Sequence, residues 1–64
     1  MNLTEKLNYM VEKRKQLFTQ EQISKMTGVS RSHISNFENG RVNNMYLYDF
    51  YMNAFMKGDD VNEH

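Results

Sequence analysis

The 64-residue chain contains no cysteine, no proline and no tryptophan, and it has only three glycines. Without cysteine it can form neither a disulfide framework nor a thiolate metal site, which is typical of proteins of the reducing cytoplasm. No apolar run is long enough to span a membrane, and no signal-peptide pattern is present. The lack of proline favours uninterrupted helices. We therefore expect a single all-α domain, a compact bundle of four or five short helices in a cytoplasmic protein.

The chain also lacks a net charge, because eight Lys and Arg residues balance eight Asp and Glu residues. These charges are unevenly distributed. Residues 1–57 carry all eight basic and five acidic residues (8 − 5 = +3), whereas residues 58–64 carry three acidic residues (−3). We predict a folded domain over residues 1–57 and a flexible acidic tail over residues 58–64. A weakly basic domain can neutralise phosphates locally, so a nucleic-acid partner is not excluded.

Apolar residues recur at helical spacing in four segments of the chain. They predict helices over residues 2–16, 20–27, 31–39 and 45–57. None of these helices is long enough to be stable alone, so their apolar faces must share one core. The predicted core residues are Leu7, Met10, Val11, Leu17, Phe18, Ile23, Met26, Val29, Ile34, Phe37, Leu47, Phe50, Ala54 and Phe55.

The stretch from Thr19 to Arg41 predicts two short helices joined by a tight turn. Thr19 and Ser30 suit the N-cap position, because their hydroxyl groups can accept a backbone N–H from the first turn. Gly28 suits the left-handed conformation that commonly closes a helix. A helix, a short glycine turn and a second capped helix form a helix-turn-helix, whose second helix lies in the DNA major groove.

The outer face of the predicted helix over residues 31–39 is polar once Ile34 and Phe37 are assigned to the core. Its side chains match DNA bases chemically, since Arg can bind guanine, Asn can bind adenine, and Ser can donate or accept. Polar residues are also normal on any exposed helix, so a protein partner stays open at this point. The candidate base contacts are Arg31, Ser32, Ser35 and Asn36, and the candidate phosphate contacts at the start of the preceding helix are Thr19 and Gln20.

Six short strings lie at fixed spacing within this stretch and specify it further. They are Thr19-Gln20-Glu21, Ile23-Ser24, Gly28-Val29-Ser30, Arg31-Ser32, Ile34-Ser35 and Glu38-Asn39-Gly40. With these strings, the chain from about Leu7 to Phe55 resembles the helix-turn-helix domain of the Cro/C1-type phage repressors, the XRE family. The resemblance implies the fold of the lambda repressor. The chain departs from the family at Ser24, where a small Ala is usual and where the hydroxyl needs a partner.

The resemblance also implies a role for individual residues. In the family, one group of positions reads bases, another contacts phosphates, and an ion pair joins the first helix to the end of the third. The base-reading positions are Arg31, Ser32 and Asn36, with His33 beside them. The phosphate-binding positions are Thr19, Gln20, Ser30, Ser35, Asn39, Gly40 and Arg41. The ion pair is Lys13 with Glu38, with Arg14 as the neighbour that can take the place of Lys13.

These features predict a sequence-specific DNA-binding regulator, a phage-type repressor or Cro-like switch protein that binds a near-palindromic operator as a homodimer. The segment 45–57 is rich in aromatic residues and Met, which favours pairing of two copies. No cofactor and no metal are expected. An enzyme is disfavoured, because no carboxylate is spaced to orient His33. The alternative is a protein-binding module of the same fold, similar to an antirepressor or antitoxin.

Overall fold

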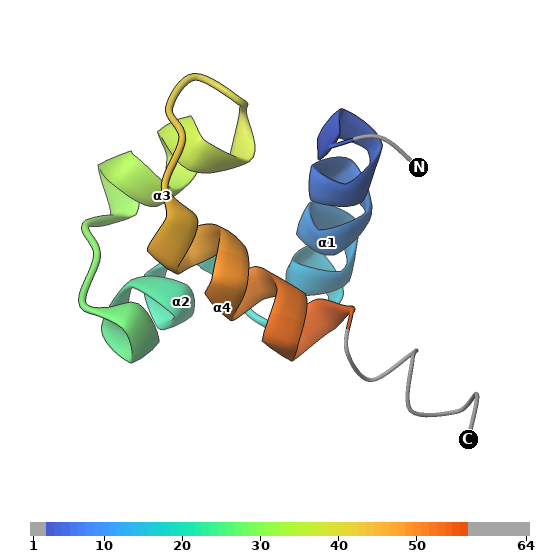
Figure 1. Cartoon of the computed structure of the whole chain (residues 1–64). Helices are drawn as coiled ribbons and strands as arrows, with labels where there is room; N and C mark the ends of the chain where they lie inside the picture. The colour runs from blue at the N-terminus through green and yellow to red at the C-terminus, as the bar shows by residue number, and fades with distance from the viewer. Residues whose placement is uncertain (1–2, 57–64) are drawn as a thin grey trace.

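A computed structural model describes residues 3–56 of the chain, and these residues form four helices (Figure 1). The helices are α1 (Leu3–Leu17), α2 (Gln20–Thr27), α3 (Arg31–Glu38) and α4 (Met45–Phe55). The predicted all-α fold is therefore confirmed. Helix α2 has both of its predicted ends, and α3 and α4 end one and two residues before their predicted ends. The predicted tail over residues 58–64 lies outside the described residues.

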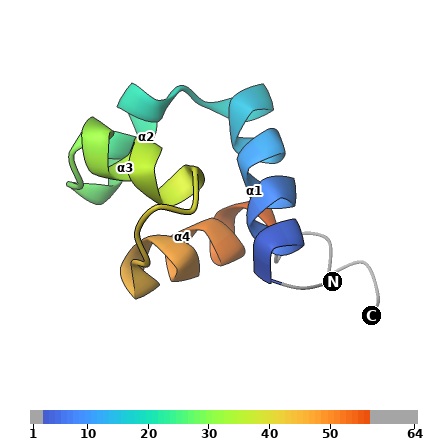
Figure 2. The same cartoon turned by 90° about the horizontal axis from the view of Figure 1, so that it is seen from above.

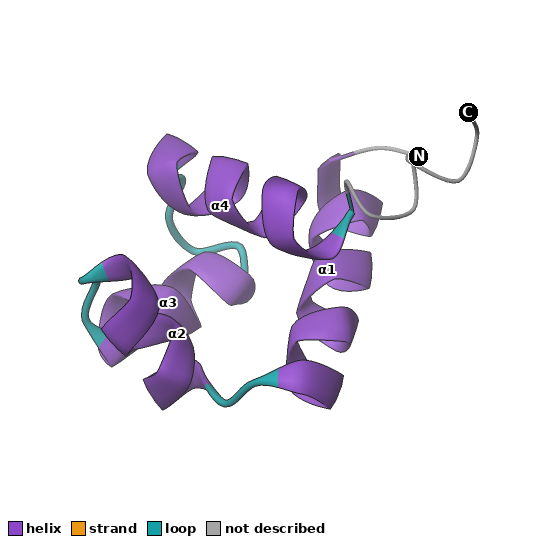
Figure 3. Cartoon of the chain, turned by 90° about the horizontal axis from the view of Figure 1, so that it is seen from below, coloured by secondary structure: helices purple, strands orange, loops and turns teal. Residues whose placement is uncertain are grey.

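Helices α2 and α3 pack against each other on one side of the molecule, and α1 stands on the other side (Figure 1). Helix α4 runs between these two parts, as the view from above shows (Figure 2). Only short loops join the helices (Figure 3). Helices α1 and α4 thus pack against one side of the α2–α3 pair. The opposite side of the pair is not covered by another helix of residues 3–56.

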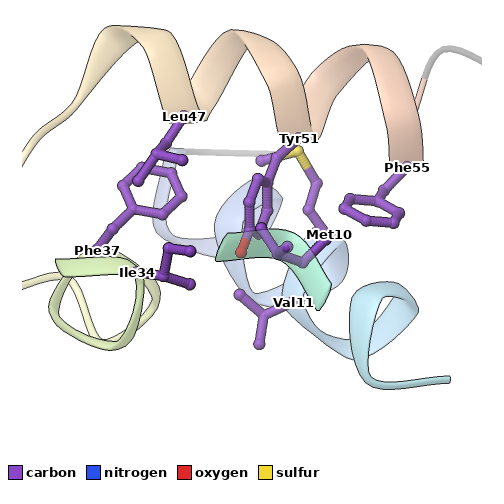
Figure 4. Packing of buried hydrophobic residues seen from close by; sticks show 8 residues of the cluster. Met10, Val11, Ile34, Phe37, Leu47, Tyr51 and Phe55 are labelled. Atoms are coloured by element: carbon purple, nitrogen blue, oxygen red, sulfur yellow. The ribbon is translucent and has the colours of Figure 1, made fainter. Parts of the chain in front are cut away.

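The core lies where the four helices meet, and each helix contributes to it. Seen from close by, the α4 side chains point toward α1 and α3 (Figure 4). The ring of Tyr51 packs edge-on against Phe37 and Phe55, with ring centroids 5.2 and 5.3 Å apart. The buried residues are Met10 and Val11 of α1, Ile23 of α2, Ile34 and Phe37 of α3, and Leu47, Tyr51 and Phe55 of α4.

Of the fourteen predicted core residues, seven are buried, four are half-buried against them and three are exposed. Leu17 and Met26 are 62 % and 48 % exposed, and Ala54 is also exposed. Phe18, predicted in the core beside Leu17, packs against it, with its ring centroid 6.4 Å from that of Phe55. Tyr51, absent from the predicted core, is fully buried. The hydroxyl group of Tyr51 is satisfied in the interior by a hydrogen bond to Glu38 of α3.

Candidate nucleic-acid interface

The start of α2 is fixed by a reciprocal pair of hydrogen bonds. Gln22 N donates to Thr19 Oγ1 (3.1 Å), and Thr19 N donates to Gln22 Oε1 (2.8 Å). This capping box confirms Thr19 as the N-cap, and the side chain of Gln22 completes it. Thr19 accepts with its oxygen, so its own O–H can still donate to a phosphate. Ser30 caps α3 in the same way, because its Oγ accepts from His33 N (3.2 Å).

The turn between α2 and α3 depends on Gly28, which has φ +76° and closes α2 by donating from its N–H to Ser24 O (2.8 Å). This left-handed conformation disfavours residues with a Cβ atom. The hydroxyl group of Ser24 donates to Val29 O (2.6 Å), so the partner that Ser24 needs is a backbone carbonyl within the turn. Both bonds tie the turn to the last part of α2.

Five predicted contact residues come together on the free side of α2 and α3. They line one shallow hollow, which takes its polar surface from the start of α2 and the outer face of α3. None of the five is acidic, so the hollow is lined by hydrogen-bonding groups and one positive charge. Glu21 lies beside it, in a neighbouring hollow that shares Gln20 and Arg31. The residues of this hollow, which we call the α2–α3 face, are Gln20, Arg31, Ser32, Ser35 and Asn36.

His33, predicted beside the base-reading residues, does not line this hollow. Its Nε2 is 2.9 Å from Nδ2 of Asn44, the residue whose Oδ1 caps α4 by accepting from Leu47 N (3.0 Å). The reason is helical geometry, since at about 100° per residue His33 lies about 160° around α3 from both Arg31 and Ser35. His33 therefore joins α3 to the start of α4. Tyr46 of α4 makes a separate link to α2, because its hydroxyl donates to Thr27 O (3.1 Å).

The segment Asn39–Arg41, predicted to contact phosphates, uses its backbone within the protein. Its three backbone N–H groups donate to the carbonyls of Ser35, Phe37 and Asn36 at 2.9–3.1 Å, so they close α3 instead of facing a phosphate. Gly40 has φ +77° and provides a turn, which leaves it no donor group for DNA. The exposed side chains of Arg41 and Asn39 remain available for phosphates, and Asn39 Nδ2 already gives one N–H to Ser35 O (2.9 Å).

Behind the α2–α3 face, the Glu38 carboxylate at the end of α3 accepts four hydrogen bonds. Arg14 of α1 donates to both oxygens, from Nε to Oε2 (2.8 Å) and from Nη2 to Oε1 (2.5 Å). Tyr51 of α4 donates to Oε2 (2.5 Å), and Gln20 of α2 donates to Oε1 (3.0 Å). Arg14 and Glu38 are 6 % and 9 % exposed. This network, which we call the Glu38 network, joins all four helices at one buried point.

The ion pair therefore involves Arg14, and the predicted assignment to Lys13 is wrong. Arg14 follows Met10 by four residues and Val11 by three, so all three lie on the buried face of α1. Lys13 lies on another face, with its Nζ 5.3 Å from the centre of the Tyr9 ring. The basic residue of the ion pair is thus one residue closer to the start of α2 than the resemblance implied.

The network determines the ionisation of its members. Burial raises the pKa of Glu38, but the hydrogen bonds from Arg14, Tyr51 and Gln20 outweigh it, and the pKa falls below the ordinary 4.5. The hydrogen bond to Glu38 raises the pKa of Arg14 despite burial. Burial and the adjacent carboxylate raise the pKa of Tyr51 well above 10.0, so its hydroxyl keeps the proton that it donates.

The lowered pKa of Glu38 predicts a loss of stability in acid. The unfolded chain binds a proton at Glu38 more readily than the folded chain, so the stabilisation is complete above the unfolded value of 4.5 and is lost as the pH falls through the lower folded-state pKa. We expect the free energy of unfolding to decrease below pH 4.5 and Glu38→Gln to show less of this decrease. Urea unfolding from about pH 7 to about pH 3 measures it. Equal acid sensitivity in both proteins would contradict the assignment.

Comparison with known families agrees with this geometry. A family model described as helix-turn-helix matches residues 11–43, which is 33 of the 64 residues and extends from α1 through the turn after α3. The chain belongs to this family, the Cro/C1-type (XRE) helix-turn-helix proteins. It is a DNA-binding helix-turn-helix regulator, and its family is one of regulatory domains rather than enzymes. Neither the curated proteins nor the solved structures contain a match. Within residues 3–56, every helix is too short or too polar to cross a membrane.

Proposed function

We propose that the protein is a sequence-specific transcriptional regulator of the phage repressor or Cro type, which places α3 in the major groove of its operator. The observation that carries this proposal is the α2–α3 face. Arg31, Ser32 and Asn36 line one hollow with Gln20, and none of the residues that line it is acidic. An arginine and an asparagine on one helix face suit the edges of guanine and adenine.

The same face argues against a protein partner as the main ligand. A helix that binds a protein usually offers apolar or aromatic side chains at the centre of its interface, with charged groups at the rim. The apolar residues of α3, Ile34 and Phe37, are instead buried behind the face. The face therefore suits a polar and negatively charged ligand, and double-stranded DNA in the cytoplasm of a bacterium or a phage-infected cell is the proposed one.

Arg41 supplies a test of the phosphate contacts. Replacing Arg41 by Ala should weaken binding to all DNA sequences alike and reduce the slope of log K against log salt concentration by about 1, because one fewer counterion is released. Fluorescence anisotropy at several salt concentrations measures both effects. Arg41→Lys keeps the charge and should keep the slope. An unchanged slope in Arg41→Ala would show that this side chain makes no phosphate contact.

We further propose that two copies bind one operator. Two-fold pairing would place two α3 helices about one DNA turn, ~34 Å, apart and would require a near-palindromic site. Tyr51 and Phe55 of α4 are buried in the protein's own core, so pairing must use other surfaces. Sedimentation of the saturated complex should give two protomers per operator. One protomer per operator would rule out the pairing.

A further inference from the structure

We infer that Glu38 is a positioning residue for DNA binding, because it holds the side-chain amide of Gln20 in the orientation in which that amide meets a DNA phosphate. The inference rests on the proposed function and adds to it a residue that does not itself touch DNA. It connects the buried ion pair of Arg14 and Glu38 with Gln20, a residue of the α2–α3 face.

The contact between the two residues is direct. Gln20 Nε2 donates to Glu38 Oε1 at 3.0 Å, and the same Gln20 side chain lines the α2–α3 face with Arg31 and Asn36. Glu38 is buried and is held from the other side by Arg14 and Tyr51. The carboxylate is thus a fixed point, and Gln20 lies between it and the surface.

The chemistry of the carboxylate selects one of the two orientations of the amide. An ionised carboxylate only accepts hydrogen bonds, so Gln20 must turn its NH₂ group toward Glu38. One N–H then serves Glu38, and the second N–H of Nε2 is available to a phosphate oxygen. The last torsion of a glutamine is otherwise broad, with no strongly preferred angle. Without Glu38, the amide would have to be ordered when DNA binds, at a cost in affinity.

A double-mutant cycle separates this role from a purely structural one. The proteins are the wild type, Glu38→Gln, Gln20→Ala and the double variant, and each is measured by anisotropy on an operator selected from random DNA. Glu38→Gln replaces one oxygen by NH₂, so the side chain can no longer accept from Arg14, Tyr51 and Gln20 together. Alone it should weaken binding about two- to tenfold, and with Gln20→Ala already present it should cause less than about a twofold loss. Equal losses in both backgrounds would overturn the inference.

A second measurement needs no variant of Glu38 and so avoids any loss of folding. In the free wild-type protein, NMR relaxation of the side-chain amide should show Gln20 to be restricted, whereas the exposed Gln16 of α1 should be mobile. Equal mobility of the two amides would also overturn the inference. A wild type that binds no DNA contradicts the proposed function itself, whereas a binding wild type with additive losses contradicts only the role of Glu38.

Discussion

Replacing Arg14 by Ala is expected to lower the free energy of unfolding by about 3–5 kcal/mol, the largest effect that we predict for a single substitution. The change would leave the buried Glu38 carboxylate without its charged partner and would remove three hydrogen bonds, two to Glu38 and one from Nη1 to Phe18 O (3.2 Å). Domains of this size bury little surface and have stabilities of similar magnitude. Most of the variant should therefore be unfolded at 37 °C.

Two neighbouring lysines are matched controls for this prediction. Lys15 pairs with Glu12 at 3.4 Å, but both side chains are more than half exposed, so Lys15→Ala should change the stability by less than about 1 kcal/mol. Lys13 lies over the Tyr9 ring, and Lys13→Ala should also cost about 1 kcal/mol or less. Urea unfolding followed by circular dichroism ranks the three variants. A loss in Lys13→Ala as large as that in Arg14→Ala would restore the original assignment of the ion pair.

The second large effect that we predict is a loss of the protein's preference for its operator over other DNA sequences. Arg31→Ala or Asn36→Ala should remove about 1–3 kcal/mol of discrimination between the preferred base pair and its alternatives, or roughly 5- to 150-fold. The reason is that each side chain lies on the α2–α3 face, where it can bond to a base edge. Both residues lie outside the buried core, so the fold should persist, and circular dichroism checks this.

Competition binding against single-base operator variants measures the loss, with two contrasting controls. Arg41→Ala should weaken all sequences equally and keep the preference. Asn53→Ala removes an exposed amide that bonds to Asp49 O on α4, and it should change neither affinity nor preference. If Arg31→Ala and Asn36→Ala keep the full preference of the wild type, α3 is not the reading helix.

The features that the sequence predicted best are those that neighbouring residues determine. The caps at Thr19 and Ser30 depend on residues within one helical turn, and the left-handed Gly28 is determined by its own missing Cβ. The bounds of α2 and the start of α4 at its cap Asn44 follow from such local signals. The α2–α3 face was also predictable, because burial of Ile34 and Phe37 determines which side chains of α3 turn outward.

The features that could not be predicted depend on contacts between distant parts of the chain. Arg14 and Tyr51 lie on the apolar faces of α1 and α4, and their polar groups are satisfied by Glu38, which is 24 and 13 residues away from them. The position of Arg14 on the apolar stripe was a usable signal, since a charge there requires a buried partner. No comparable signal marked His33, whose contact with Asn44 depends on how the loop after α3 returns.

Selection of bound sequences from a random pool of double-stranded DNA tests the central claim most directly. The account predicts enrichment of one near-palindromic site whose half-sites contain a guanine and an adenine that Arg31 and Asn36 can contact. The same selection with Arg31→Ala should lose the guanine, and with Asn36→Ala the adenine. A pool that shows no enrichment with the wild-type protein would contradict sequence-specific DNA recognition by this chain.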